Sequence, residues 1–561
     1  MNRFAALLDR LALTPARNAK LRLMTEYFRT TPDPDRGYAL AALTGDLDIP
    51  SVKPAILRAL AVERLDETLF AYSYDYVGDL AETIALTWPA RPGANRPPGL
   101  GEAVTRLQAA SRMEGPRLME QWLDALDATG RWGLIKLVTG ALRVGVSARL
   151  AKQAAADIGG KPVNEIEELW HGLAPPYADL FAWLEGRGDR PVSKAVAPFR
   201  PAMLSHALAD NELDLISPAD YAAEWKWDGI RVQAVREGNV ARLYTRTGDD
   251  ISGAFPDVVE AIGFEGAIDG ELLVGARGES GFAAARFADL QQRLNRKTVS
   301  PRLLASHPAF VRAYDCLVID GEDLRALSFR ERRKRLEALL ARAGGERFDL
   351  SPLVPFRDAN ELRALRASPP EPIVEGIMLK RWDSTYQPGR PKGPWFKWKR
   401  HPHVIDAVLM YAQRGHGKRS SYYSDYTFGV WTEGENGDEL VPVGKAYFGF
   451  TDAELAEIDR FIRNNTENRF GPVREVTHLP SRGLVLEIAF EGIARSNRHR
   501  SGVAMRFPRI SRLRWDKPPS EADRLETLEK LIPDDRAFTA PVRGIGREPA
   551  DTHIRRGRRS P

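Results

Sequence analysis

A lysine set between carboxylates and tryptophans, in the stretch E-W-K-W-D-G-I-R at 224–231, is the first candidate for chemistry in this chain. Apolar residues on both sides predict a buried strand that ends in a glycine-led turn. Residues two apart on a strand share a face, so Glu224, Lys226 and Asp228 should point one way and Trp225 and Trp227 the other. Lys226 is therefore a candidate nucleophile.

The chemistry expected of Lys226 sets conditions on its surroundings. An amine attacks phosphorus only without its proton, and a free lysine has a pKa of about 10.4. Closing the gap to neutral pH takes roughly 4 kcal/mol, which nearby cations and partial desolvation can supply. Glu224 and Asp228 work against this unless they bind something else, so a metal ion and further Lys and Arg are required. On its own, K-x-D-G is a short motif, and it fits a surface Lys–Asp strand pair better than a nucleophilic lysine.

Several later stretches offer side chains that could converge on this lysine. Strands are expected at 243–248, 267–273, 312–321, 375–380 and 395–400. The side chains in question are Arg231, Arg246, Glu271, Tyr314, Glu375, Lys397 and Lys399. The two glutamates offer oxygen ligands to a divalent ion, the four cations balance phosphate charge, and the tyrosine ring offers a surface for a base. Taken singly, each fits a solvated strand edge.

The elements that must position these residues divide the chain into parts. Residues 1–195 show helical periodicity and predict an all-α region, with Thr14 and Pro15 as the start of a second helix. Prolines at 198 and 201 predict an extended linker. Residues 202–400 mix strands and helices, including one at 328–342, and predict an α+β domain. Short strands at 402–517 with one helix at 452–464 predict a β-barrel of the OB type.

Two basic segments lie outside these elements. A basic turn is expected at 415–419. Residues 518–561 form a C-terminal extension, and its Arg-rich tail after about 540 is expected to be disordered and to touch nucleic acid nonspecifically.

The helical region contains one stretch suited to a phosphate backbone, G-A-L-R-V-G-V-S-A-R-L-A-K at 140–152. Ser147 is placed to cap a helix, and small residues, a helix N-terminus and cations together favour phosphate contacts. Arg143, Arg149 and Lys152 are the expected DNA-binding residues. The alternative is a solvated helix with an ordinary glycine turn.

Composition restricts the class of protein. The 561 residues are enough for about three domains, and 43% hydrophobic with 28% charged residues is typical of a soluble globular protein. A single cysteine, Cys316, excludes a disulfide framework and a multi-cysteine zinc site, and it indicates a reducing compartment. No apolar run reaches about 18 residues and no signal peptide is recognisable, so a cytoplasmic protein without membrane contact is expected.

Six motifs in order make the chain resemble the covalent nucleotidyltransferases, most closely the bacterial ATP-dependent DNA ligases. They are K-W-D-G at 226–229, D-G-E at 269–271, Y-D-C-L-V-I-D-G at 314–321, E-G-I-M-L-K at 375–380, W-F-K-W-K at 395–399 and R-F-P-R-I-S-R-L-R-W-D-K at 506–517. The resemblance covers about residues 1–517, and the L-R-V-G-V-S segment looks like the family's DNA-binding domain. Length and tail resemble a subgroup linked to cisplatin-damage response.

The resemblance implies a role for each matching residue. Lys226 would carry AMP, with Asp228 beside it, and Glu224 would read the adenine amino group while Tyr314 stacks on the ring. The implied contacts to sugar, phosphate and metal come from Arg231, Arg246, Glu271, Glu375, Lys397 and Lys399, and those to pyrophosphate from Arg512, Asp516 and Lys517. Where the family often has an arginine before its W-x-K motif, this chain has Pro391, so Arg390 or Lys392 should substitute.

The resemblance also implies substrates and partners. ATP would be the nucleotide, because NAD-dependent ligases carry a four-cysteine zinc module that one cysteine cannot build. Mg²⁺ or Mn²⁺ would assist, and a monomer acting on nicked double-stranded DNA is expected in repair, recombination or replication. Two alternatives stay open: an RNA ligase or capping-type nucleotidyltransferase, and a DNA-binding clamp without catalytic activity.

Overall fold

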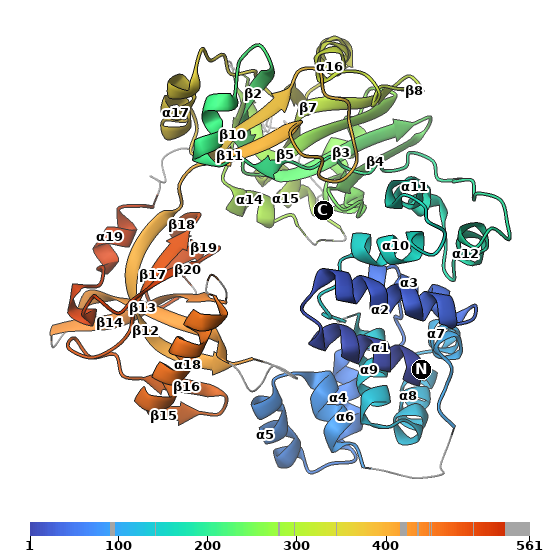
Figure 1. Ribbon diagram of the computed structural model, residues 1–561, viewed down its shortest axis with the longest axis vertical. Coiled ribbons are helices and arrows are strands. Elements are labelled where there is room, and N and C mark those ends of the chain that lie inside the picture. The colour runs from blue at the N-terminus through green and yellow to red at the C-terminus, as the bar shows by residue number, and fades with distance from the viewer. Residues whose placement is uncertain are drawn as a thin grey trace, which may run out of the picture.

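The computed structural model describes residues 1–532 apart from 90–95, 141, 279–280, 295, 297, 344, 416–422, 435–436, 448, 450 and 498. Three regions lie around a common centre: a helical one, a middle one built on two sheets, and a β-rich one (Figure 1). The basic turn expected at 415–419 lies largely outside the described residues, and the basic tail lies wholly outside them.

The first region is all helical over its described residues, as the sequence predicts. Its helices bury one apolar cluster that includes Phe4, Phe28 and Phe181. They are α1 (Asn2–Leu13), α2 (Arg17–Thr30), α3 (Asp35–Thr44), α4 (Pro54–Val62), α5 (Glu67–Val77), α6 (Leu80–Thr87), α7 (Leu100–Ala109), α8 (Glu114–Ala125), α9 (Ala128–Thr139), α10 (Ala148–Ala156), α11 (Val163–Leu169), η1 (Trp170–Gly172) and α12 (Ala178–Leu184).

One predicted helix start is confirmed and another is wrong. Ser147 caps α10, because its side chain accepts a hydrogen bond from the Leu150 amide (3.2 Å). Thr14 ends α1 instead of starting α2: its hydroxyl donates to the Arg10 carbonyl (2.7 Å), and α2 begins at Arg17 behind Ala16. A threonine hydroxyl bonds the preceding turn as readily as it caps a following one, which is why the sequence alone misplaces it.

The middle region is built on two sheets that face each other across the candidate site. One has the strand order β1-β11-β10-β2, and the other the order β4-β3-β5-β7-β8, with β6 on β5 and β9 on β7. The strands are β1 (His206–Ala207), β2 (Tyr221–Trp227), β3 (Ile230–Glu237), β4 (Val240–Thr245), β5 (Gly266–Gly278), β6 (Gly281–Ala284), β7 (Ala309–Ile319), β8 (Glu322–Asp323), β9 (Phe348–Leu350), β10 (Val374–Arg381) and β11 (Trp395–Lys399).

Helices cover the outer sides of these sheets. They are η2 (Asp210–Leu215), η3 (Ser252–Ala254), α13 (Pro256–Glu260), α14 (Phe287–Gln291), α15 (Pro301–Ser306), α16 (Phe329–Ala343) and α17 (Ala359–Ala367). The helix α16, predicted at 328–342, packs on β7 and turns Arg332 and Arg333 inward, where both are buried. Residues 198–204, where the prolines at 198 and 201 predict an extended linker, contain no helix and form one β-bridge, between Met203 and Gly389.

The third region is a β-rich unit of OB-like form, in which a curved sheet runs β14-β13-β12-β16-β15, with β17 paired to β12 and β20 paired to β17. Its elements are β12 (His403–Arg414), β13 (Tyr423–Gly434), β14 (Gly437–Ala446), α18 (Asp452–Asn465), β15 (Thr466–Phe470), β16 (Val473–Val476), β17 (Val485–Phe490), β18 (Gly492–Arg495), β19 (Val503–Arg506), β20 (Arg509–Arg514), η5 (Pro519–Glu521) and α19 (Leu525–Glu529). The predicted helix at 452–464 is thus confirmed.

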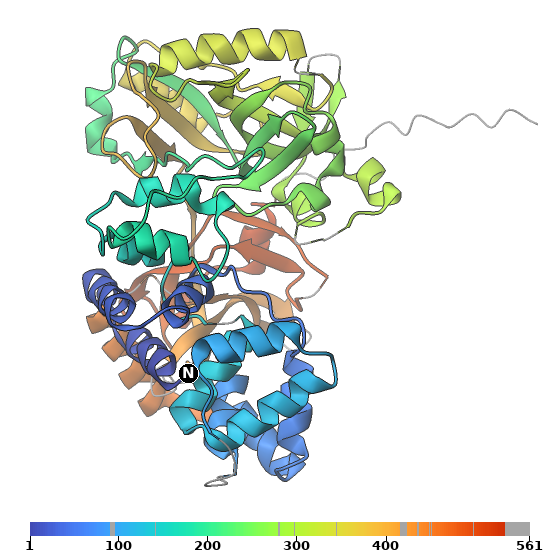
Figure 2. The ribbon, with the colours of Figure 1, turned by 90° about the vertical axis from the view of Figure 1, so that its right-hand side faces the viewer.

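The helical and β-rich regions each contact the middle region. In the quarter-turned view, α10–α12 lie against the β3–β4 end of the middle region (Figure 2). There Glu168 forms an ion pair with Arg325, and the His171 ring meets the Tyr244 ring at a centroid distance of 5.2 Å. Lys399 joins Glu491 of the third region (3.0 Å). No helix among the described residues is both long and apolar enough to cross a membrane.

Candidate active site

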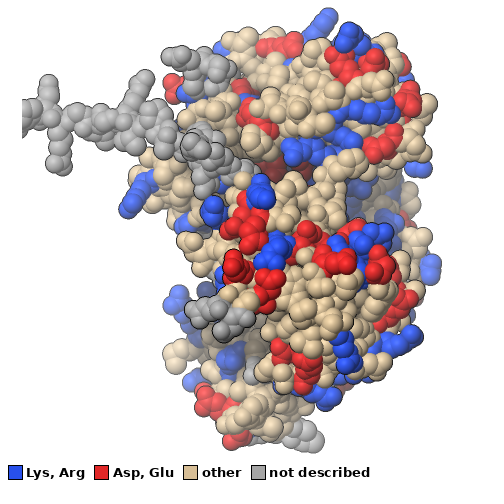
Figure 3. All heavy atoms as spheres, turned by 90° about the vertical axis from the view of Figure 1, so that its left-hand side faces the viewer, with Lys and Arg blue, Asp and Glu red and all other residues tan. Residues whose placement is uncertain are grey.

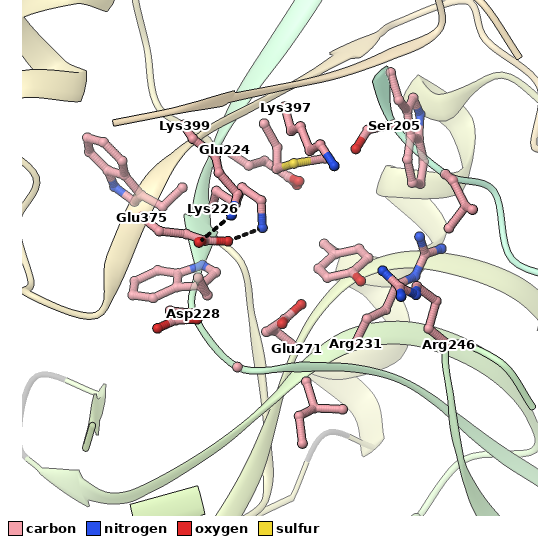
Figure 4. A pocket seen from close by; sticks show the side chains of 18 of the residues that line it. Ser205, Glu224, Lys226, Asp228, Arg231, Arg246, Glu271, Glu375, Lys397 and Lys399 are labelled. Atoms are coloured by element: carbon pink, nitrogen blue, oxygen red, sulfur yellow. Dashed lines mark hydrogen bonds and ion pairs between the residues drawn. The ribbon is translucent and has the colours of Figure 1, made fainter. Parts of the chain in front are cut away.

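A cavity of about 490 Å³ lies between the two sheets of the middle region. Strands β2, β10 and β11 supply one wall, and β3, β5 and β7 supply the other. Of the residues predicted from sequence, it is lined by Glu224, Lys226, Asp228, Arg231, Arg246, Glu271, Tyr314, Glu375, Arg390, Lys397 and Lys399 (Figure 4). Trp225 and Trp227 contact apolar clusters, as strand alternation predicts, but both also border the cavity, which it does not predict.

Lys226 is held in the cavity by a carboxylate from the neighbouring strand. Its ammonium forms an ion pair with Glu375, whose other oxygen lies 3.1 Å from Lys399 (Figure 4). Burial opposes ionisation of Glu375, but the two ammoniums outweigh it and hold its pKa below the ordinary value. The two side chains meet because β2 and β10 pair with Lys226 opposite Gly376.

A bulge explains why Glu375 faces the cavity. Strict alternation along β10 would place it with Ile377 and Leu379, which are buried in an apolar cluster. The register shifts between Val374 and Gly376, which turns Glu375 to the other side. Gly376 is required there, since a Cβ atom would lie 2.4 Å from the Trp398 carbonyl oxygen.

Glu224 is fully buried on the cavity wall with both oxygens engaged by cations. One oxygen lies 2.8 Å from Arg333 Nη1 and the other 2.5 Å from Lys380 Nζ. The same Lys380 ammonium stands 4.3 Å from the centre of the Tyr314 ring. The sequence analysis required Glu224 to bind something else, because its charge would oppose loss of the Lys226 proton. The structure meets this requirement, since Glu224 is neutralised by partners other than Lys226.

Asp228 has its own partner as well. It forms an ion pair with Arg506, which reaches into the cavity from the third region. Burial raises the pKa of Asp228 even though Arg506 opposes the shift.

Arg231 is fixed by buried acceptors that include Asp269 on β5 and Tyr386 in the segment between β10 and β11. Its Nη2 lies 2.6 Å from Asp269 Oδ2 and 3.0 Å from the Tyr386 hydroxyl, and the same hydroxyl donates to Asp269 (2.6 Å). Tyr314 stands close by, with the Arg231 guanidinium 5.9 Å from its ring centre.

The cations divide between two sides of the cavity. Arg231 and Arg246 lie across it from Glu375 (Figure 4). Burial lowers the pKa of Lys397, and its neighbours Arg390 and Lys226 lower it further. Of the two residues expected to substitute at Pro391, Arg390 lines the cavity.

Glu271 and Glu375 are the carboxylates that could hold a divalent ion. Burial raises the pKa of Glu271 to about 7, although Lys226 and Arg231 counteract it. No group of three or more His, Cys, Asp or Glu side chains in the described part of the chain could bind a metal unaided. Mg²⁺ commonly takes one or two carboxylates and completes its shell with substrate phosphates and water, so these two residues fit it.

Three further predicted residues are placed away from the cavity. Arg512 on β20 pairs with Glu487 (2.9 Å), Lys517 pairs with Asp406 (2.8 Å), and Asp516 pairs with Arg514 (2.9 Å). They were expected at the pyrophosphate, and this arrangement does not bring them there. The β-rich region instead turns the start of the same motif, Arg506 and Phe507, to the cavity.

The expected DNA-binding residues are only partly exposed. Arg143 is exposed in the glycine turn, with φ of 45°. Lys152 is buried with its ammonium 4.2 Å from the Trp170 ring centre, and burial lowers its pKa to about 8. Its side chain is therefore not presented on the surface of α10, and its role in DNA binding stays a prediction. Arg149 is held by Glu167 and Asn164.

Sequence reasoning missed several residues of the site. Arg333, Lys380 and Asp269 hold the predicted residues in place, and Arg506 joins from a distant segment. A signal existed for Lys380, which ends the motif E-G-I-M-L-K on a buried strand. None existed for pairing Arg506 with Asp228, since 278 positions separate them.

Comparison with known proteins agrees with this geometry. Residues 202–399 match the family model described as ATP dependent DNA ligase domain, and residues 419–517 match that described as ATP dependent DNA ligase C terminal region. A protein of Anaeromyxobacter dehalogenans named "Probable DNA ligase" is 32% identical, over 93% of this chain and 97% of its own length. One of Opitutus terrae with the same name is 30% identical over 94% of this chain, which spans 62% of that protein.

A solved structure titled Pmar-Lig_Pre has the same fold, with a TM-score of 0.57 at 15% identity over 91% of this chain and 99% of that one. A lysine held between two sheets among carboxylates and cations, with a β-rich region beside it, defines the class of nucleotidyltransferases. Within that class, the chain belongs to the ATP-dependent DNA ligase family.

Proposed function

We propose that this protein seals nicks in duplex DNA at the expense of ATP, with Lys226 as the residue that carries AMP. The observation that supports this most directly is the placement of the Lys226 amine in a cavity with carboxylates on one side and Arg246 and Arg231 on the other. The relatives' printed names and the family models support the same substrates.

The first step forms a phosphorus–nitrogen bond at Lys226. The ammonium loses its proton, the amine attacks the α-phosphorus of ATP, and the bond to the β-phosphate oxygen breaks to release pyrophosphate. Arg246, Arg390 and Lys397 are placed to balance the triphosphate charge, and Tyr314 and Glu224 to hold the base. Glu271 and Glu375 would hold Mg²⁺ or Mn²⁺, which neutralises charge as phosphoryl bonds exchange.

Two transfers complete the reaction. An oxygen of the DNA 5′-phosphate attacks the lysine-bound phosphorus, and Lys226 leaves and regains a proton. The 3′-hydroxyl then attacks the 5′-phosphorus, loses its proton, and AMP departs. The three regions around one centre suit a protein that surrounds a duplex and contacts its backbone. We propose domain limits near 195, 202–400 and 402–517, and a monomer as the working form.

Radioactive labelling tests this proposal. With ATP labelled at the α-phosphate, the wild-type protein should become covalently labelled, and Lys226→Ala should not, while nicked-DNA binding is kept. The matched control is Lys334→Ala, an exposed lysine of α16 outside the cavity, which should label normally. Retention of label by Lys226→Ala would rule out the assignment.

The same assay separates the alternatives. Labelling by GTP in preference to ATP, or sealing of RNA nicks and not DNA nicks, would indicate a capping-type enzyme or an RNA ligase. Absence of any label in the wild type would indicate a DNA-binding protein without catalysis.

A further inference from the structure

Two arginines of the cavity lie beside glycine turns that contact the helical region. Arg246 is two residues before Gly248, which has φ of +90°, and Arg390 follows Gly389, which has φ of +87°. A Cβ atom on Gly248 would lie 3.0 Å from His171 Nε2, and one on Gly389 would lie 3.0 Å from Arg149 Nη2. Each turn therefore has a helical-region side chain packed directly against its backbone.

The His171 contact supports a well-ordered turn. The His171 ring lies edge-on to Tyr244 at 5.2 Å and to Phe199 at 5.7 Å between ring centres. Beyond Tyr244 the turn is closed by hydrogen bonds from the Thr245 amide to the Asp249 carbonyl (2.9 Å) and from the Gly248 amide to the Thr245 carbonyl (3.0 Å). Because the turn is closed on itself, its position as a unit depends on what its outer side packs against.

Arg149 likewise packs against the other turn, the one at Gly389, as a side chain held in place by its own partners. Arg149 is anchored within the helical region by its ion pair with Glu167 and by a hydrogen bond from its Nη2 to Asn164 Oδ1 (2.8 Å). Gly389 is tied to the linker, since its amide donates to the Ala202 carbonyl (3.0 Å). The Arg149 side chain is partly exposed, but its guanidinium is fixed by these partners and packs against the residue before Arg390.

From these two contacts we infer that the helical region is part of the nucleotide site. His171 and Arg149 act as positioning residues: they hold the turns that present Arg246 and Arg390 to the triphosphate. This inference rests on the proposed function. Because coupling between binding events is reciprocal, ATP binding must in turn favour the docked helical region.

The experiment measures self-adenylation without DNA, with the full chain and α-labelled ATP. The reaction without DNA is a single turnover, so KM is used here for the ATP concentration that gives half the maximal labelling rate. His171→Ala and Arg149→Met should each raise this apparent KM by about 3- to 10-fold, the usual range for contacting residues, and change the maximal labelling rate by less than about twofold. His171→Phe keeps the ring contacts with Tyr244 and Phe199, so it should restore the wild-type KM. This rescue separates ring packing from misfolding.

Two comparisons decide the inference. His171→Ala combined with Arg246→Ala should raise KM by less than the product of the single effects, because both act through one arginine. Glu168→Gln weakens a different contact of the same interface, the ion pair with Arg325, and should leave KM within about twofold of wild type. The inference would be overturned if the double variant raised KM by the full product of the single effects. It would also be overturned if Glu168→Gln raised KM as much as His171→Ala does. A wild-type protein that takes no label would instead contradict the proposed function.

Discussion

At the scale of the residue, the carboxylates of the cavity differ in how readily they ionise. Glu375 is kept ionised by two ammoniums, whereas burial raises the pKa of Glu271 to about 7. An unfolded glutamate titrates near 4.5, so between that value and about 7 Glu271 is protonated only in the folded protein. The folded state then binds more protons than the unfolded state, and stability falls as pH rises through this window.

Glu271→Gln removes that ionisation and should stabilise the protein selectively at high pH. We expect the melting temperature of the variant to exceed that of the wild type at pH 8 and the difference to shrink toward pH 5. Calorimetry across this range checks it. An equal shift at both ends would show that the effect does not come from titration of Glu271.

The pair of cations on Glu224 leads to a second prediction. Arg333→Met leaves Glu224 with Lys380 alone, so the carboxylate is less firmly placed against the base. The preference for ATP over GTP in self-adenylation should fall by about 10-fold, the equivalent of one weakened hydrogen bond to a charged group. Competition labelling measures it, and Lys334→Met, at the neighbouring exposed position, serves as control. Unchanged preference would mean that Arg333 has only a structural role.

Single residues were predictable from sequence when their own motif carried the chemistry. Lys226, Glu271, Tyr314 and Lys397 line the cavity as expected, because strand alternation fixes where each side chain points. Arg506 and Arg512 belong to one motif, and no pattern in the sequence shows that the first, and not the second, meets the cavity. That choice depends on how the third region is oriented.

At the scale of the element, α16 is anchored by a buried ion pair. Both Arg332 and Asp315 of β7 are fully buried, and two hydrogen bonds of 2.8 and 3.0 Å join them. A buried charge that loses its partner is costly, because it can be neither solvated nor neutralised.

Asp315→Ala should therefore destabilise the protein strongly. We expect a loss of about 3–5 kcal/mol in the free energy of unfolding of the middle region, measured by denaturant titration. Glu322→Ala removes the exposed pair with Arg335 near the same strand and should cost less than about 1 kcal/mol. Similar costs for both would contradict the importance of burial.

Elements with a clear period were predicted well, and irregular ones were not. The helix at 452–464 and the strands at 375–380 and 395–399 follow their patterns. The bulge at Val374 and Gly376 leaves no mark in a period-two pattern, yet it decides that Glu375 faces Lys226.

At the scale of the whole molecule, residues from two separate regions complete the middle region. Arg506 of the third region pairs with Asp228, and its guanidinium lies 4.1 Å from the Phe287 ring centre. One of the molecule's faces shows acidic and basic side chains in mixed clusters, in keeping with a net charge of only +5 (Figure 3). Specific ion pairs, more than the net charge, therefore hold the regions in place against one another.

Reversing one of these charges should impair sealing. Arg506→Glu places a carboxylate against Asp228, and we expect nick sealing by pre-adenylated protein to slow by about 10-fold, or ~1.4 kcal/mol. Arg506→Lys should retain most of the rate. Arg495→Glu, an exposed change in the same region, controls for altered net charge. Equal rates for Arg506→Glu and Arg495→Glu would show that the contact does not matter for sealing.

The ion pair between Lys226 and Glu375 has a consequence for the protein at rest. A protonated amine is inert toward acyl phosphates, aldehydes and other small electrophiles that circulate in a cell. On the proposed function, a bound triphosphate and its counter-ion would draw the glutamate away and free the amine to react. The ion pair thereby protects Lys226 from modification by such electrophiles while no substrate is bound.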